Sequence, residues 1–335
     1  MTIYDISEKA GVSIATVSRV LNGSSNVSEA TKQKVLAVIE QYGYTPNAFA
    51  RGLGLNTMKT IGIMCADSSD LYLAKAIYYI ERELRANGYD SLLCCSGYDL
   101  ETKISSMNLL ITKKVDSIIL VGSNFIYETE EENKYICDAA LQVPVMLLNA
   151  TLDTPNVYSI LSDDRASTYE ATLQMIASGI TDILYFYNSQ TYSGQKKLSG
   201  FLTAMEEKKL LDEGIHTLFY HGSHEDIPAM AKQLLEFHQS GAVFHGIIAA
   251  DDYLALGAIK YAKELGLTIP DELSIIGHNN SMLATCCDPE LTSVDDRLER
   301  LCNHLTTTLM EVLNGNTVPQ TTVFSGKIVK RGTTK

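Results

Sequence analysis

From residue 60 onward, short apolar runs alternate with longer stretches of helical periodicity. This alternation restricts the possible folds more than any other feature of the chain. One helical stretch, residues 71–87, places Leu73, Ile77, Ile80 and Leu84 on a single face. Strands that alternate with helices are typical of parallel sheets covered on both faces. The runs predicted to form buried strands are TIGIMC, DSIILVG, VPVMLLN, DILYFY, HGIIAA and LSIIG.

These runs are too numerous for one sheet of ordinary size. We therefore expect residues 59–335 to form an α/β body of two doubly wound parallel-sheet lobes. The chain is expected to cross between the lobes near 161–164, 288–292 and 317–325. Hydrophobic residues make up 45% and charged residues 20% of the chain, which fits a folded globular protein.

Residues 1–46 follow a different pattern, that of a small all-α domain. Helix caps and apolar spacing predict helices over residues 3–10, 13–23 and 28–43, with Ser13 and Ser28 as caps. Three helices joined by tight turns predict a helix-turn-helix unit. An ordinary three-helix module that binds another protein is the alternative reading of the same spacing.

The second of these helices has two distinct sides. Small residues near its start on the outward side let the backbone approach base edges in a DNA groove. Arg19 on that side has the donors for a bidentate contact with guanine, and Ile14 or Ala15 can meet a thymine methyl group. The residues predicted to face inward are Val17, Val20 and Leu21. Those predicted to face outward are Ile14, Ala15, Ser18, Arg19 and Asn22.

The net charge of −13 is unevenly distributed along the chain. Through Lys59 there are six basic and four acidic residues, a net charge of +2, so the rest of the chain carries −15. Screening over about 8 Å at physiological salt lets the N-terminal domain approach DNA independently of the acidic body. The acidic body is expected to weaken nonspecific binding to nucleic acid.

Residues 2–53 closely resemble the lactose-repressor (LacI/GalR) family of bacterial transcriptional regulators. The resemblance rests on the run TIYDISEKAGVSIATVSRVLNG, followed by VSEAT and YGYTPNAFARGL. It implies a homodimer that binds a pseudo-palindromic, double-stranded DNA operator, most often as a repressor. By this resemblance the base-reading residues are Ile14, Ala15 and Arg19, and the residues that hold the DNA backbone are Tyr4, Thr16, Ser18, Asn22 and Asn26.

The segment 47–58 is interpreted as a hinge helix or linker. Asn47 is a helix cap, but Gly52 and Gly54 each oppose helix formation by about 1 kcal/mol relative to alanine. In the family it resembles, the corresponding segment orders on the operator and inserts a leucine into the minor groove. Leu53 occupies that position. Our hypothesis is that the glycines keep the hinge near its folding midpoint, so that movement of the body switches it.

Nearly every predicted strand of the body ends in a short polar cluster. Ligands of doubly wound folds bind beyond the carboxyl ends of the strands. Carboxylates and amides offer paired donors and acceptors for adjacent hydroxyls, and tyrosines stack on sugar rings, so a small polyhydroxylated ligand is expected. The candidate residues are Asp67, Ser69, Tyr72, Asn149, Asp251 and Asn279. Capping of the following helices is the structural alternative for the Asp and Asn residues.

The body also resembles the family's effector domain, which is related to periplasmic sugar-binding proteins. Lys197 falls where many members place an arginine that binds effector hydroxyls. Asn279 stands where an aspartate is frequent, and His278 where an aromatic residue is usual. The resemblance implies a carbohydrate effector bound between the lobes. Because these departures alter the cleft, a nucleobase or nucleoside effector stays open as an alternative.

Motifs of other protein classes are missing from the sequence. There is no G-x-S-x-G, G-x-x-x-x-G-K-[ST] or H-E-x-x-H motif, so no catalytic residue, metal or cofactor is expected. The doublets at 163–164 and 295–296 suggest a glycosidase only weakly, since sequence neighbours need not flank a glycosidic bond. The seven cysteines form no C-x-x-C pair and are expected to be reduced and structural. An enzyme with an appended DNA-binding domain remains an alternative.

Nothing in the sequence indicates export or membrane insertion. No apolar run approaches the roughly 20 residues of a membrane span, and the first eight residues carry acids where a secretory signal carries bases. We therefore expect a cytoplasmic protein without a membrane partner. A sugar-binding transport component, the remaining rival, needs an export signal.

Overall fold

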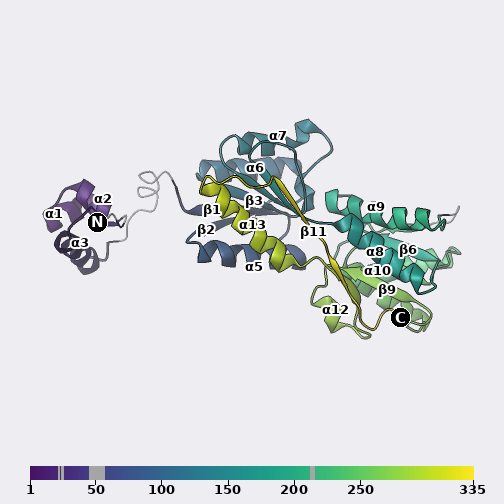
Figure 1. Cartoon of the computed structure of the whole chain (residues 1–335). Helices are drawn as coiled ribbons and strands as arrows, with labels where there is room; N and C mark the ends of the chain where they lie inside the picture. The colour runs from purple at the N-terminus through teal and green to yellow at the C-terminus, as the bar shows by residue number, and fades with distance from the viewer. Residues whose placement is uncertain (22, 24–25, 45–56, 212–215) are drawn as a thin grey trace.

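The computed structural model describes residues 1–21, 23, 26–44, 57–211 and 216–335. At the N-terminus lie three short helices, α1 (Ile3–Ala10), α2 (Ile14–Leu21) and α3 (Glu29–Gln41). Figure 1 shows them as a unit of their own, set apart from a larger α/β body. Asn22 and Leu53, both predicted to contact DNA, lie outside the described residues, as does most of the predicted hinge over 47–58.

Local hydrogen bonds set where these helices begin. The Thr2 hydroxyl accepts from the Asp5 backbone N–H, and the Asp5 carboxylate accepts from the Thr2 backbone N–H at 2.7 Å. The predicted caps on the next two helices are present: Ser13 Oγ accepts from the Thr16 N–H at 3.1 Å, and Ser28 Oγ accepts from the Thr31 N–H at 3.3 Å. Each cap satisfies an N–H that has no partner inside its helix.

The core of this N-terminal domain is small. Its buried residues come from all three helices: Ile6, Ala10, Val17, Val20 and Val35. Val17 and Val20 are buried as predicted, and Leu21 is half-buried against the same cluster. With so few buried side chains, each one carries a large share of the domain's stability.

The first lobe is built on a six-stranded sheet in the order β11-β5-β4-β3-β1-β2, and all its strand pairs are parallel. Helices α5 and α13 pack together on one face, and α6 and α7 on the other (Figure 1). The strands are β1 (Thr60–Cys65), β2 (Asp90–Cys95), β3 (Ser117–Val121), β4 (Val145–Leu148), β5 (Val157–Ser162) and β11 (Thr321–Phe324). The helices are α5 (Leu71–Ala86), α6 (Leu100–Thr112), α7 (Glu130–Ala140) and α13 (Leu298–Leu313), with the short 3₁₀ turn η1 (Ser123–Phe125).

The second lobe has its own six-stranded sheet in the order β12-β10-β9-β8-β6-β7, parallel except for the antiparallel β10–β12 pair. Its strands are β6 (Ile183–Tyr187), β7 (Thr217–Phe219), β8 (Gly246–Ala249), β9 (Ser274–His278), β10 (Thr292–Asp295) and β12 (Lys327–Val329). Its helices are α8 (Asp164–Ala177), α9 (Tyr192–Glu207), α10 (Ile227–Gln239), α11 (Asp252–Leu265) and α12 (Leu283–Cys286). The predicted architecture of two parallel-sheet lobes is confirmed.

The chain passes between the two sheets three times. It leaves the first sheet after β5, returns between β10 and α13, and joins the sheets again between β11 and β12. Residues 288–292 lie before and at the start of β10, so the second passage falls at residues 296–297. Among the described residues, no helix combines the length and apolar character needed to cross a lipid bilayer.

Candidate DNA-reading helix and interlobe cavity

The outward side of α2 is open to solvent. Ile14 is 39% exposed, and Ala15 and Arg19 are exposed as well, whereas Val17 on the opposite side is fully buried. Arg19 thus presents its guanidinium on the same face as two small or apolar side chains. A helix with this face is suited to reading base edges in the major groove of DNA.

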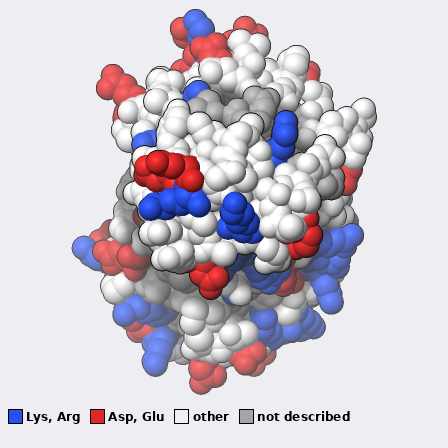
Figure 2. All heavy atoms as spheres, turned by 90° about the vertical axis from the view of Figure 1, so that its left-hand side faces the viewer, with Lys and Arg blue, Asp and Glu red and all other residues white. Residues whose placement is uncertain are grey.

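The expected backbone-holding residues lie around this face. Tyr4 on α1 is 68% exposed, and Asn26 ahead of α3 is exposed. Thr16 and Ser18 are half-buried, and the Thr16 hydroxyl is 2.9 Å from the Ser13 hydroxyl at the start of α2. Figure 2, viewed from the side on which the helical domain lies in Figure 1, shows basic and acidic side chains interspersed over this side of the whole molecule. Binding of DNA phosphates on this side would therefore depend on local side chains rather than on a field of one sign.

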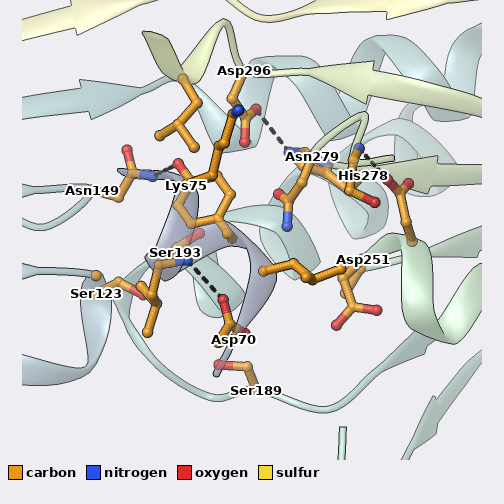
Figure 3. A pocket seen from close by; sticks show the side chains of 18 of the residues that line it. Asp70, Lys75, Ser123, Asn149, Ser189, Ser193, Asp251, His278, Asn279 and Asp296 are labelled. Atoms are coloured by element: carbon orange, nitrogen blue, oxygen red, sulfur yellow. Dashed lines mark hydrogen bonds and ion pairs between the residues drawn. The ribbon is translucent and has the colours of Figure 1, made fainter. Parts of the chain in front are cut away.

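A cavity of about 1200 Å³ lies between the two lobes of the body. Both lobes contribute to its wall, as Figure 3 shows: Ser123 and Asn149 lie on one side, and Asp251, His278 and Asn279 on the other. Its wall follows the carboxyl ends of parallel strands, because Asn149 comes directly after β4 and Asn279 directly after β9.

Five of the seven residues expected to bind an effector line this cavity: Tyr72, Asn149, Lys197, Asp251 and Asn279. The other two, Asp67 and Ser69, are not part of its wall. The Asp67 carboxylate instead accepts from the Ser69 backbone N–H at 2.8 Å and from the Ser69 hydroxyl at 2.7 Å. These bonds lower the pKa of Asp67. The pair stabilises the turn that follows β1, and the cap of the following helix α5 is Asp70 rather than Asp67.

Asn149 holds one wall of the cavity in place. Its backbone is left-handed, with φ 60°, a conformation that asparagine tolerates better than most residues. The side-chain amide donates to the Tyr72 hydroxyl, and its carbonyl oxygen accepts from the Ser162 backbone N–H at 3.0 Å. Burial raises the pKa of Tyr72 far above its ordinary value. The phenol therefore stays neutral and can both donate and accept a hydrogen bond.

Lys197 and Asp251 belong to the second lobe and line the cavity opposite the wall that holds Asn149. The Lys197 ammonium, on α9, donates to the Ala250 carbonyl oxygen at 3.0 Å and is almost fully buried. Asp251 caps α11 by accepting from the Leu254 N–H at 2.8 Å, and it also accepts from the Asn188 side-chain amide at 3.1 Å. Burial raises the pKa of Asp251. Asp251 therefore both caps α11 and lines the cavity.

The sequence did not reveal a buried charged cluster at the point where the lobes join. His278 Nε2 lies 3.1 Å from Asp296 Oδ1 and 3.6 Å from Asp164 Oδ1, and all three residues are buried. The Ser162 hydroxyl donates to Asp296 at 3.1 Å, and the Ser193 hydroxyl donates to Asp164. His278 and Asp296 line the cavity. The cluster therefore connects two of the interlobe passages with the ligand-sized space between the lobes.

Opposing effects set the protonation of this cluster. Burial and the charge of Lys197 disfavour a protonated His278, but the two carboxylates outweigh them and raise its pKa. Burial works against ionised Asp296, but the nearby His278 outweighs it and lowers the pKa of Asp296. The three ligand atoms lie within 4.8 Å of one another, a spacing that also suits a metal ion. A charged imidazole between two carboxylates offsets one of their two charges without a metal ion.

Comparison with known proteins agrees with both parts of the molecule. Residues 2–47 match the family of bacterial regulatory proteins described as the lacI family, and residues 172–334 match a periplasmic binding protein-like domain. An HTH-type transcriptional regulator of Lachnoclostridium phytofermentans is 52% identical over 100% of this chain and 99% of its own length. Catabolite control protein A of Priestia megaterium is 34% identical, covering 88% of this chain and 87% of its own.

Solved structures share the fold. A Lac repressor dimer bound to operator and the anti-inducer ONPF has a TM-score of 0.88 at 23% identity, covering 100% of this chain and 99% of that one. The transcriptional regulator CelR in complex with cellobiose has a TM-score of 0.70 at 22% identity, covering 99% of both chains. The N-terminal helices, the two lobes and the extended match to curated relatives lead to one conclusion: the chain belongs to the lacI family of bacterial regulatory proteins.

Proposed function

We propose that the protein is a sequence-specific transcriptional regulator, a repressor, that binds a double-stranded operator through the exposed side of α2. The observation that carries this proposal is that α2 has one side exposed to solvent and the other side buried in the domain core. Ile14, Ala15 and Arg19 are exposed, while Val17 and Val20 anchor the helix in the core. Relatives named as HTH-type transcriptional regulators support it. No catalytic role is assigned, and the protein is expected to act in the cytoplasm, where bacterial DNA lies.

The operator is proposed to be pseudo-palindromic and to be bound by a homodimer. One small domain reads only a few base pairs, and a two-fold dimer doubles the contact with two half-sites. The dimer described for the Lac repressor on its operator supports this arrangement. The test is a footprint with the purified chain. Protection of two inverted half-sites about one helical turn apart, or a multiple of that distance, is expected.

The effector is proposed to be a small carbohydrate bound in the interlobe cavity. The wall combines amide, carboxylate, ammonium and hydroxyl groups from both lobes, including Tyr72, Asn149, Lys197, Asp251 and Asn279. Such a set pairs donors and acceptors with the adjacent hydroxyls of a sugar. The cellobiose bound by the regulator CelR supports this class. Nucleosides also carry adjacent hydroxyls, so they form the second arm of the test.

Control of DNA binding is proposed to follow from closure of the lobes. A ligand that touches both walls favours one angle between the lobes, and this angle sets the separation of the two hinge segments of a dimer. Coupling of this kind is typically worth about 1–3 kcal/mol, or about 5- to 150-fold in operator affinity. The hinge over 47–58 and the wedge at Leu53 remain predictions.

Arg19→Ala tests the DNA-reading assignment. We expect it to lose about 1–3 kcal/mol of discrimination at one base pair of the operator, measured with a set of single-base operator variants. Lys9→Ala is the matched control. It also removes a basic side chain from the N-terminal domain, but Lys9 lies on α1, over the ring of Tyr42, and not on α2. An Arg19 variant that weakens operator and random DNA equally would show that Arg19 contacts phosphate rather than a base.

A thermal-shift screen of sugars and nucleosides tests the effector site, with Lys197→Ala and Lys196→Ala as a matched pair. These neighbours differ in position: Lys197 is buried at the cavity, whereas Lys196 is exposed beside Tyr192. A sugar that stabilises wild type and the Lys196 variant but not the Lys197 variant supports the proposal. Stabilisation by nucleosides alone, or equally in both variants, contradicts it.

A further inference from the structure

The first sheet brings together two cysteines that are 30 residues apart in the sequence. Cys65 ends β1 and Cys95 ends β2, and they are register partners in the parallel ladder. Their Sγ atoms are 3.8 Å apart. The sequence carries no C-x-x-C motif, so this contact arises only from the pairing of the two strands.

The backbone around this pair suits a disulfide. Neighbouring strands lie about 4.8 Å apart, inside the range of Cα separations that disulfides bridge. Beyond the pair, the Ser96 N–H donates to the Cys65 carbonyl at 2.8 Å and the Gly97 N–H donates to the Ala66 carbonyl at 3.0 Å. These bonds hold the two cysteines opposite each other. The sulfurs need to approach by only about 1.8 Å to form a bond.

The two thiols differ in their access to solvent. Cys95 is exposed on the edge strand, whereas Cys65 is fully buried in the core between the sheet and α5. Burial, with a smaller effect of Cys95, raises the pKa of Cys65 to about 12. A small oxidant in solution therefore reaches Cys95 first. Cys94 packs against the core on the other face of the sheet, so its side chain is turned away from Cys65.

We propose that Cys65 and Cys95 form a reversible intramolecular disulfide when the protein meets a hydroperoxide. The Cys95 thiol gives up its proton and the thiolate attacks one oxygen of hydrogen peroxide. The O–O bond breaks, a sulfenic acid forms on Cys95, and the departing hydroxide takes up that proton and leaves as water. The Cys65 sulfur then attacks the Cys95 sulfur; its proton passes to the departing oxygen, which leaves as a second water. The two thiols lose two electrons and two protons, and hydrogen peroxide becomes two waters.

This bond would join two segments that lead to the interlobe cavity. The chain after β1 carries Asp70, and the chain after β2 carries Tyr98, and both residues line the cavity. A disulfide between Cys65 and Cys95 would link these two segments covalently where they leave the ends of β1 and β2. The site is thus a covalent modification site in the wall of the proposed effector lobe, and it does not depend on which effector binds.

The full-length protein tests the proposal directly. Wild type, Cys95→Ser and Cys94→Ser are treated with hydrogen peroxide, remaining thiols are alkylated, and the digests are analysed by mass spectrometry. In wild type and the Cys94 variant we expect a linked peptide pair containing residues 65 and 95, with a mass loss of about 2 Da that dithiothreitol reverses. The Cys95 variant should lack this pair while keeping its circular dichroism spectrum, since Cys95 is exposed.

Two results would overturn the proposal. One is oxidation of Cys95 to sulfinic acid without a link to Cys65. The other is a link between the Cys95 residues of two chains, which would make the exposed thiol an intermolecular site instead.

Discussion

Ile6→Ala is expected to unfold the N-terminal domain while leaving the body intact. Ile6 is fully buried in a core of five residues drawn from three short helices. Globular domains gain about 0.05–0.15 kcal/mol per residue, which for a domain of about 45 residues amounts to roughly 2–7 kcal/mol. Removing a buried isoleucine side chain typically costs about 2–5 kcal/mol. The free energy lost by the substitution is therefore comparable to the whole free energy of unfolding of this domain.

The effect on DNA binding follows from the fraction of folded domains. With a loss of about 3.5 kcal/mol from an equal stability, half of the domains are unfolded without DNA. If two domains must be folded to bind one operator, apparent affinity falls about fourfold, and it falls further for larger losses. Operator titration by fluorescence anisotropy measures this change, and helical circular dichroism on heating separates the domain's transition from that of the body.

Leu36→Ala is the control within the same domain. Leu36 lies on α3 and is 39% exposed, so its removal is expected to cost about 0.5 kcal/mol or less. If Ile6→Ala melts and binds operator like wild type, the small core is not what holds the domain together. Equal losses in both variants would also refute the reasoning, because burial would then not decide the effect.

Three further predictions concern the body. Because the pKa of His278 is raised from 6.5 in the folded state, its charged form stabilises the body fully below about pH 6.5, and this contribution is lost as pH rises through the folded pKa. His278→Gln should therefore flatten the fall in melting temperature as the pH rises above 6.5, and an unchanged slope would contradict the ion pair. At Gly200 a methyl group would lie 2.2 Å from the Arg165 carbonyl oxygen, so Gly200→Ala should force α8 and α9 apart and cost about 1–3 kcal/mol by urea denaturation, whereas Ser199→Ala should not. Asn149→Ala leaves the Ser162 N–H without its partner and should cost about 1–3 kcal/mol by the same method; a variant as stable as wild type would show that the bond is dispensable.

Burial separates the predicted strands from the missed edge strands, although β5 and β10 were missed as well and are mostly buried. The central strands β1, β3, β4, β6, β8 and β9 read as continuous apolar runs because helices cover both faces. Edge strands β2, β7 and β12 have half-exposed or exposed positions, so their sequences lack such runs. Residues 161–164 were expected to cross between the lobes, but Leu161 and Ser162 complete β5 and the chain crosses only after them.

Sequence alone determined the features that depend on neighbouring residues. Caps and apolar spacing act within a few residues, so they fixed the three N-terminal helices and the outward side of α2. The polar segments after the central strands likewise placed Tyr72, Asn149 and Asn279 beyond the carboxyl ends of strands in the two sheets, where the cavity lies.

Only the tertiary structure decided which distant residues meet. Asp164, His278 and Asp296 come from three separate parts of the chain and touch because the interlobe passages converge. Cys65 and Cys95 meet through strand register. Contacts of this kind depend on the path of the whole chain, and no local pattern in the sequence records that path.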